Sequence, residues 1–307
     1  MKTPDAPRGV WAAQPIPWSD DEEFDPGRYQ SDVEYLCAQG VHGVYSGGTT
    51  GEFYTLDFNE FQATNTVMLR TAARYKVPVQ VGVTALCTRE VVRRTRWAAD
   101  HGAAGVQVAL PFWLALKDDE VLNFFRDVGA AAGESYIIHY DTMRSKRTIG
   151  PDLYLAIRRE VPHLLGSKLA DDRVESLAEC RRVLLDFTLF VGESALQAGM
   201  AHGARGTYSS LVMTNPKRIL ELYSACAEGR EKQAQGITER IQRFSKFLQP
   251  YRDKGYLDSA IDRMKAMLNP NMKCGLRCRK PYKFFSPAEL NEIRAWLEEN
   301  DSELLTR

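Results

Sequence analysis

The chain has 307 residues, of which 44% are hydrophobic and 26% are charged, and its 40 lysines and arginines balance its 40 aspartates and glutamates. This composition excludes a disordered chain, and the zero net charge argues against a nucleic-acid-binding protein. No apolar run approaches the roughly 20 residues that a membrane span needs, and the first ten residues lack the apolar core of a secretory signal, so we expect a cytoplasmic protein with no membrane partner.

Short runs of β-branched residues alternate with longer amphipathic stretches through the first two thirds of the chain. We expect strands at Val10–Pro17, Gly43–Ser46, Pro78–Thr84, Gly105–Pro111, Tyr136–Asp141, Leu164–Ala170, Phe187–Gly192 and Gly206–Ser210. Helical patterns lie between them at about 27–39, 57–74, 88–101, 118–132, 151–160, 173–183 and 194–202. Eight strands that alternate with helices predict an α/β fold of the (β/α)8 or TIM barrel type. An open doubly wound sheet is the alternative, but no nucleotide-binding fingerprint follows the first strand.

The pattern changes after Ser210, where only helices are expected. Their positions are about 214–228, 230–252, 257–268 and 286–299. We therefore divide the chain into a catalytic barrel domain at residues 1–212 and a C-terminal helical extension at residues 213–307, a bundle packed on the barrel.

The cysteines and histidines are scattered and do not form a metal-binding motif. Cys274 and Cys278 are the only close pair, and a zinc knuckle would need two further ligands nearby. We therefore expect no metal site.

A glycine-rich turn follows the expected second strand, where Gly47, Gly48 and Gly51 surround Thr49 and Thr50. The glycines permit positive φ and close approach of the backbone, and the threonines offer N–H and hydroxyl donors to a carboxylate or phosphate. The alternative interpretation is a tight turn that only caps the next helix.

Lys168 stands within the apolar run of the expected sixth strand. An ammonium group inside a barrel is costly unless it is paired or deprotonated, and a desolvated lysine is a nucleophile that forms Schiff bases with ketones and aldehydes. The alternative is a lysine that reaches solvent at the strand end or pairs with Asp171 or Asp172.

Tyr140 ends the expected fifth strand, one strand–helix unit before Lys168, so parallel strands would bring the two residues together. A phenol beside a cation can give and take protons, as imine chemistry requires. The alternative is an ordinary tyrosine at the barrel mouth. A lysine, a tyrosine and an anion-binding turn at three strand ends of one barrel favour a catalytic site.

These residues together resemble one known family. Gly48–Glu52, Tyr140, the Gly-x-Lys of residues 166–168 and Gly192-Glu193 are similar, in this order, to the dihydrodipicolinate synthase/N-acetylneuraminate lyase family. The resemblance extends from about residue 9 to about residue 281. It implies a lyase or aldolase that forms a Schiff base with pyruvate or another 2-oxo acid, joins or releases an aldehyde, and uses no metal or other cofactor. It also implies a homotetramer.

Carried over by position, the resemblance implies a role for several residues. Lys168 forms the imine, Tyr140 relays the proton, and Thr49 assists the relay. Thr49 and Thr50 hold the pyruvate carboxylate. The remaining expected substrate-site residues are Gly48, Gly192, Glu193 and, for a distal carboxylate, either Arg144 or Arg147, between which the alignment does not decide.

Within the family, the segments 84–96, Pro111-Phe112-Trp113 and 278–282 are similar to hydratase-aldolases that cleave aromatic benzalpyruvates. We therefore expect an aromatic or apolar acceptor, with Trp113 stacked on it. Synthases usually place a tyrosine of the neighbouring subunit where Phe112 and Trp113 stand here.

Three alternatives stay open at this point. The first is dihydrodipicolinate synthase, which condenses pyruvate with aspartate semialdehyde. The second is a sugar-acid lyase or dehydratase, which Ala170 disfavours because sialic acid lyases use a hydroxyl at that position. The third is a non-catalytic regulatory paralogue that only binds a keto acid, against which the retention of Lys168 and Tyr140 argues.

Overall fold

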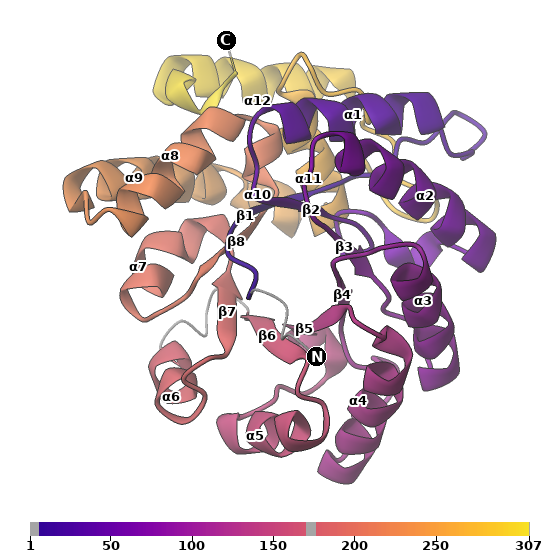
Figure 1. The fold of residues 1–307 in the computed structure, drawn as a ribbon. Coiled ribbons are helices and arrows are strands. Elements are labelled where there is room, and N and C mark those ends of the chain that lie inside the picture. The colour runs from indigo at the N-terminus through magenta and orange to yellow at the C-terminus, as the bar shows by residue number, and fades with distance from the viewer. Residues whose placement is uncertain (1–5, 170–175, 307) are drawn as a thin grey trace.

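A closed barrel of parallel strands forms the centre of the molecule (Figure 1). The computed structural model describes residues 6–169 and 176–306, and in these ranges each strand pairs with the next while β8 pairs with β1. The strands are β1 (Gly9–Ala13), β2 (Gly43–Tyr45), β3 (Val79–Gly82), β4 (Gly105–Val108), β5 (Tyr136–Asp141), β6 (Leu164–Leu169), β7 (Thr188–Val191) and β8 (Gly206–Ser209). The predicted (β/α)8 barrel is confirmed.

Helices cover the outside of the barrel between the strands. They are α1 (Pro26–Ala38), α2 (Phe58–Arg74), α3 (Thr88–Asp100), α4 (Asp118–Ala132), α5 (Pro151–Glu160), α6 (Ser176–Val183), α7 (Leu196–Ala201) and α8 (Pro216–Ala227). Several begin at caps that the sequence supplies: Asp57 and Glu60 form a capping box at the start of α2, and Asn215 accepts a hydrogen bond from the Arg218 N–H at the start of α8. Such local signals explain why the expected helix boundaries lie close to the observed ones.

The first strand is shorter than expected, because β1 ends at Ala13 and does not reach Pro17. Pro15 and Pro17 have no N–H group and cannot continue a ladder between two neighbouring strands. The segment after β1 instead packs against the C-terminal helices, where the Ile16 carbonyl accepts a hydrogen bond from Arg263.

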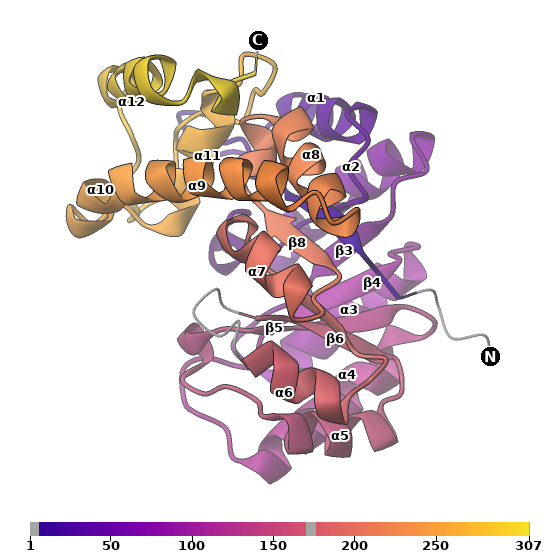
Figure 2. The same ribbon diagram turned by 90° about the vertical axis from the view of Figure 1, so that its left-hand side faces the viewer.

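After α8, the C-terminal extension continues with α9 (Glu231–Phe247), α10 (Gln249–Asp253), α11 (Asp258–Met267) and α12 (Pro287–Asn300). The single helix expected at 230–252 is divided at Leu248, because Pro250 lacks the N–H that a continuous helix needs. Figures 1 and 2 show these helices gathered beside α1 and α8, away from α4 and α5. Within the described ranges, no helix is long and apolar enough to cross a membrane.

Two of these helices approach the carboxyl ends of the strands. Helix α9 contacts the short turn Glu193–Ala195 after β7, and α11 contacts the turn Leu211–Met213 after β8. The barrel and the extension share one hydrophobic core, which includes Val10 of β1 and Ile261 of α11, both fully buried. The division of the chain into domains at residue 212 therefore stays a prediction.

Polar side chains inside the barrel form a hydrogen-bonded layer. The Gln80 side-chain amide donates to the Tyr136 hydroxyl at 3.1 Å, and the Tyr208 hydroxyl donates to the Gln80 side-chain carbonyl. Buried polar groups are tolerated when they are hydrogen-bonded in this way. The layer fixes the Tyr208 ring, which packs edge-on against the Tyr45 ring with 4.8 Å between centroids.

Candidate active site

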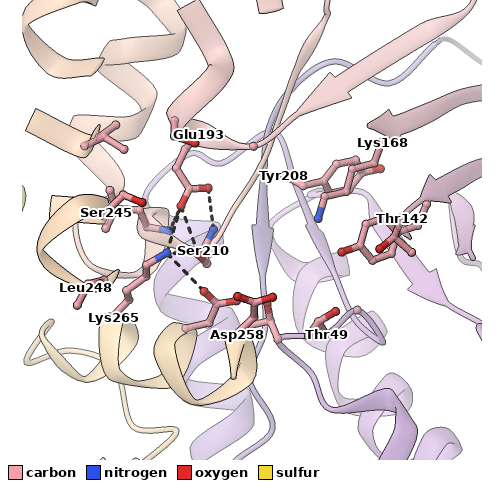
Figure 3. Close-up of a pocket in the computed structure, with 18 of the residues that line it drawn as sticks. Thr49, Thr142, Lys168, Glu193, Tyr208, Ser210, Ser245, Leu248, Asp258 and Lys265 are labelled. Atoms are coloured by element: carbon pink, nitrogen blue, oxygen red, sulfur yellow. Dashed lines mark hydrogen bonds and ion pairs between the residues drawn. The ribbon is translucent and has the colours of Figure 1, made fainter. Parts of the chain in front are cut away.

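A cavity of about 440 Å³ opens at the carboxyl ends of the barrel strands (Figure 3). Its lining comes from the loops after β2, β7 and β8, from the ends of β5 and β6, and from α9, α10 and α11. Figure 3 shows Lys168 on one side of the cavity and Glu193 with Lys265 on the other. A substrate bound between them would contact both the barrel and the C-terminal extension.

Lys168 lies directly opposite Tyr140 in the register of β6 against β5. Its ammonium nitrogen is 4.4 Å from the centre of the Tyr140 ring and 5.6 Å from the centre of the Tyr208 ring. The flanking Ser167 and Leu169 are buried, whereas the Lys168 side chain reaches the cavity. The parallel strands thus bring together the lysine and the tyrosine that the sequence places one strand–helix unit apart.

The charge of Lys168 lowers the pKa of the Tyr140 phenol below its ordinary value. Burial opposes this shift, but Arg144 and a hydrogen bond with Thr49 act in the same direction as Lys168, and the pKa stays lowered. A phenol with a lowered pKa exchanges its proton more readily near neutral pH, as a proton relay requires.

The turn after β2 brings both threonines to the cavity. Gly47 has a φ of +61°, and a Cβ at this position would lie 2.4 Å from the Gly82 carbonyl oxygen, so only glycine fits. Gly48, Thr49 and Thr50 all line the cavity. The expected position of these residues at a strand end beside Lys168 therefore agrees with the structure.

Glu52 ends this turn and attaches it to the C-terminal extension. Its carboxylate accepts hydrogen bonds from the Trp18 indole at 2.8 Å and from two nitrogens of the Arg263 guanidinium, and neither Glu52 nor Arg263 is exposed to solvent. Because loss of either partner would leave a buried charge, this pair has a structural role.

A group of charged residues on α11, which the sequence had not indicated as part of the site, also lines the cavity. The Lys265 ammonium nitrogen lies 2.9 Å from the Ser210 hydroxyl, 3.6 Å from Glu193 and 3.5 Å from Asp262. Asp258, Asp262 and Lys265 recur at the spacing of one helix face. This spacing in the sequence predicts that the three side chains share one helix face. Nothing in the sequence of the helix indicates that this face points into the barrel mouth.

Glu193 lines the cavity as expected, but its carboxylate is already hydrogen-bonded to other groups of the protein. It accepts hydrogen bonds from the Ser210 N–H at 3.3 Å, the Ser210 hydroxyl at 3.3 Å and the Leu211 N–H at 3.2 Å. Burial raises the pKa of Glu193, but Lys265 and these N–H donors outweigh burial and hold the pKa below its ordinary value. Glu193 is therefore ionised and fixes the loop after β8. Gly192 lines the cavity beside it.

The two candidate arginines take different positions. Arg144 lines the cavity and pairs with Asp258, which also pairs with Arg252. Arg147 points toward the loop before α4, where it donates to the Leu116 carbonyl at 2.6 Å and to the Asp118 carboxylate at 2.7 Å. Arg144 is thus the arginine that faces the site.

Trp113 does not line the cavity formed by the described residues. Its side chain is 74% exposed, and its carbonyl accepts a hydrogen bond from the Lys146 ammonium. The stacking of Trp113 on an acceptor therefore stays a prediction. Ala170, Asp171 and Asp172, which entered the interpretation of the sixth strand, lie outside the described residues.

A lysine and a tyrosine in contact at the carboxyl end of a (β/α)8 barrel are typical of class I lyases and aldolases, which work through a Schiff base. Comparison with known families gives the same class. The Dihydrodipicolinate synthetase family matches residues 6–300, and the chain belongs to this family.

Individual relatives differ in their reactions. 4-Hydroxy-tetrahydrodipicolinate synthase of Methanosphaerula palustris is 29% identical over 226 residues, which are 72% of this chain and 77% of that protein. Trans-o-hydroxybenzylidenepyruvate hydratase-aldolase of Pseudomonas putida is 32% identical over 167 residues, which are 52% of this chain and only 50% of that protein. The crystal structure of dihydrodipicolinate synthase from Aquifex aeolicus matches with a TM-score of 0.87 and 23% identity, covering 98% of this chain and 100% of that one, so the fold is shared.

Proposed function

We propose that this protein is a pyruvate-dependent class I lyase that cleaves, or in reverse forms, the carbon–carbon bond between pyruvate and an aldehyde. The contact between Lys168 and Tyr140 carries this proposal. The Lys168 amine adds to the ketone carbon of a 4-hydroxy-2-oxo acid, water leaves, and the imine that results accepts the electron pair of the carbon–carbon bond that breaks. The 4-hydroxyl loses its proton and becomes the aldehyde, and the enamine that remains takes up a proton and is hydrolysed by water to pyruvate and the free lysine. Tyr140 supplies and removes the proton at the addition and cleavage steps, assisted by Thr49.

The substrate carboxylate lies at the turn after β2 in this proposal. Thr49 and Thr50 bind it through N–H and hydroxyl donors, and Gly48 allows the ligand to approach the backbone. Gly192 lines the same cavity, where it leaves room for the carbons that follow the imine.

The proposed acceptor is an aromatic or otherwise apolar aldehyde. Ile241 and Phe244 of α9 give the cavity an apolar wall together with Leu248, which lies between α9 and α10, and the similarity to the hydratase-aldolase supports the same choice. Trp113 contributes to this site only if the assembled enzyme brings it to a cavity. We propose that the exposed Trp113 and Leu114, which follow β4, lie at a contact between subunits of the expected homotetramer.

Dihydrodipicolinate synthase is the second candidate. Arg144 in the cavity favours this candidate. The carboxylate of aspartate semialdehyde would be the second in the site, after that of pyruvate, and it needs a cation as its partner. Asp258 already pairs with this arginine, which weakens the case for a second carboxylate.

Borohydride trapping tests the class of reaction. Pyruvate followed by borohydride is expected to add the reduced pyruvyl group irreversibly to Lys168, as mass mapping would show. Lys265, a lysine of the same cavity, is the internal control and stays unmodified. An active enzyme with unmodified Lys168, or full activity in Lys168→Ala, would refute the Schiff-base mechanism.

A substrate panel then tests the acceptor. Pyruvate release is measured from arylidene pyruvates, which must add one water molecule across the double bond before cleavage, from sugar acids and from short-chain 2-oxo acids, and condensation is measured with aspartate semialdehyde. Activity with aspartate semialdehyde alone would replace the aryl proposal with the synthase. Trapping without turnover of any of these substrates would favour the keto-acid-binding paralogue.

A further inference from the structure

The Thr50 hydroxyl already has a partner in the unliganded site. It donates a hydrogen bond to the Asp262 carboxylate at 2.6 Å, although Thr50 is the residue proposed to bind the pyruvate carboxylate. A threonine hydroxyl has a single proton to donate. Pyruvate and Asp262 therefore require the same hydrogen-bond donor.

Asp262 cannot easily move away from the turn that carries Thr50, because α11 contacts this turn and the short 3-10 segment Phe53–Thr55 after it at three places. Besides the Thr50 contact, Arg263 binds Glu52, and the Tyr54 hydroxyl donates to the Ser259 hydroxyl at 3.0 Å. These contacts fix the distance between the helix and the turn.

Charged groups on several elements surround Asp262. Lys265 lies 3.5 Å away on the same helix and also pairs with Glu193 of the loop after β7. Asp258 on α11 adds a further negative charge, and Arg252 of α10 pairs with Asp258. Burial raises the pKa of Asp262 above its ordinary value, and the positive charge of Lys265 reduces this shift without reversing it. Lys265 is thus a cation that contacts the Asp262 carboxylate and favours its ionised form.

We infer that Asp262 is a positioning residue that competes with the substrate carboxylate for the Thr50 hydroxyl, and that Lys265 limits this competition. The inference rests on the proposed function, because it needs a keto acid carboxylate at Thr49 and Thr50. Two carboxylates that approach one hydroxyl also repel each other, and a neighbouring ammonium reduces this repulsion. The competition weakens pyruvate binding, which favours release of pyruvate after cleavage.

The test measures the pyruvate concentration that gives half-maximal inactivation by borohydride, which requires no knowledge of the acceptor. Asp262→Asn removes the negative charge and is expected to lower this concentration about tenfold. Lys265→Met leaves the carboxylate charges uncompensated and is expected to raise it about tenfold. The two changes break the same ion pair yet have opposite expected effects.

The control variant is Asp301→Asn. Asp301 is a buried carboxylate that pairs with Arg240 and Arg243 in the extension and does not line the cavity. The Asp301→Asn variant shows how loss of a buried ion pair far from the cavity affects folding. The pyruvate concentration that gives half-maximal inactivation of this variant is expected to stay at the wild-type value.

A purely structural pair would weaken binding in both variants. An unchanged or higher half-maximal concentration in Asp262→Asn therefore overturns the inference, even if Lys265→Met fails to fold. If the wild type is not trapped, calorimetric titration with pyruvate gives the same comparison of affinities. If the wild type binds pyruvate but is not trapped, only the Schiff-base proposal is refuted. If the wild type also fails to bind pyruvate, both the Schiff-base proposal and the inference about Asp262 are overturned.

Discussion

Tyr140→Phe separates the packing of the Tyr140 ring from the chemistry of its hydroxyl. The phenyl ring would remain beside the Lys168 ammonium, which lies 4.4 Å from the ring centre, so the environment of the amine changes little. The substitution removes only the phenolic oxygen and its hydrogen bond with Thr49. Pyruvate binding should therefore survive, and trapping at Lys168 should still reach completion, although imine formation and the other steps that move a proton become slow.

The expected loss in turnover is about 10²–10⁴-fold, the usual contribution of a positioned acid or base, which corresponds to about 3–5 kcal/mol in the activation free energy. In the wild type, turnover falls as pH rises through the pKa of Tyr140, because the phenol then loses the proton that it must donate. Since Lys168 lowers this pKa, the fall begins below the ordinary phenol pKa of about 10, and Tyr140→Phe lacks it.

The assay combines steady-state pyruvate release across pH with borohydride trapping at saturating pyruvate. Tyr256→Phe is the matched control, because it removes a hydroxyl that donates to Glu289 and does not line the cavity. Near-normal turnover in Tyr140→Phe would assign the relay to another group. Complete loss of trapping together with turnover would mean that imine formation cannot proceed without the Tyr140 hydroxyl, or that the variant does not fold.

Three further substitutions test other parts of the site. Arg144→Ala should lower kcat/KM about 10–100-fold for acceptors with a polar or anionic group. Arg147→Ala, which loses its contacts to Leu116 and to Asp118 at the start of α4, should leave kcat/KM unchanged, and equal effects in the two variants would contradict the assignment of Arg144 to the site. Glu52→Gln should lower the free energy of unfolding by about 3–5 kcal/mol, because the substitution leaves the Arg263 charge buried and unpaired. Urea unfolding measures this loss, and an unchanged unfolding midpoint would argue against a structural role of the pair. Trp113→Ala should lower kcat/KM for arylidene pyruvates about tenfold while trapping at Lys168 persists, and unchanged kcat/KM would remove Trp113 from the acceptor site.

The barrel and the position of the reactive pair could be predicted because both depend on local patterns. Strand and helix periodicities locate the elements, and the parallel topology places the ends of successive strands side by side. Tyr140 and Lys168, one strand–helix unit apart in sequence, therefore had to be neighbours if the barrel was correct.

The choice between Arg144 and Arg147 could not be predicted, because a single turn of the backbone decides it. Met143–Ser145 form a short 3-10 turn, and Lys146 then adopts a positive φ of 60°. A positive φ is unfavourable for lysine, and the sequence carries no glycine or asparagine there to indicate it. The chain reverses at this residue, so Arg144 lines the cavity and Arg147 contacts the loop before α4.

Asp262 and Lys265 were missed for a different reason, since they belong to an extension whose docking on the barrel depends on long-range packing. The contacts that bring α11 to the barrel mouth, such as Thr50 with Asp262 and Glu52 with Arg263, join residues that are more than 200 positions apart. The lysine and tyrosine proposed for the chemistry come from the strands, whereas much of the charged lining comes from α10 and α11. Substitutions in the extension can therefore alter substrate recognition while the Lys168–Tyr140 contact stays unchanged. The same division explains why Asp262 and Lys265 are expected to alter pyruvate affinity in opposite directions without changing which lysine forms the imine.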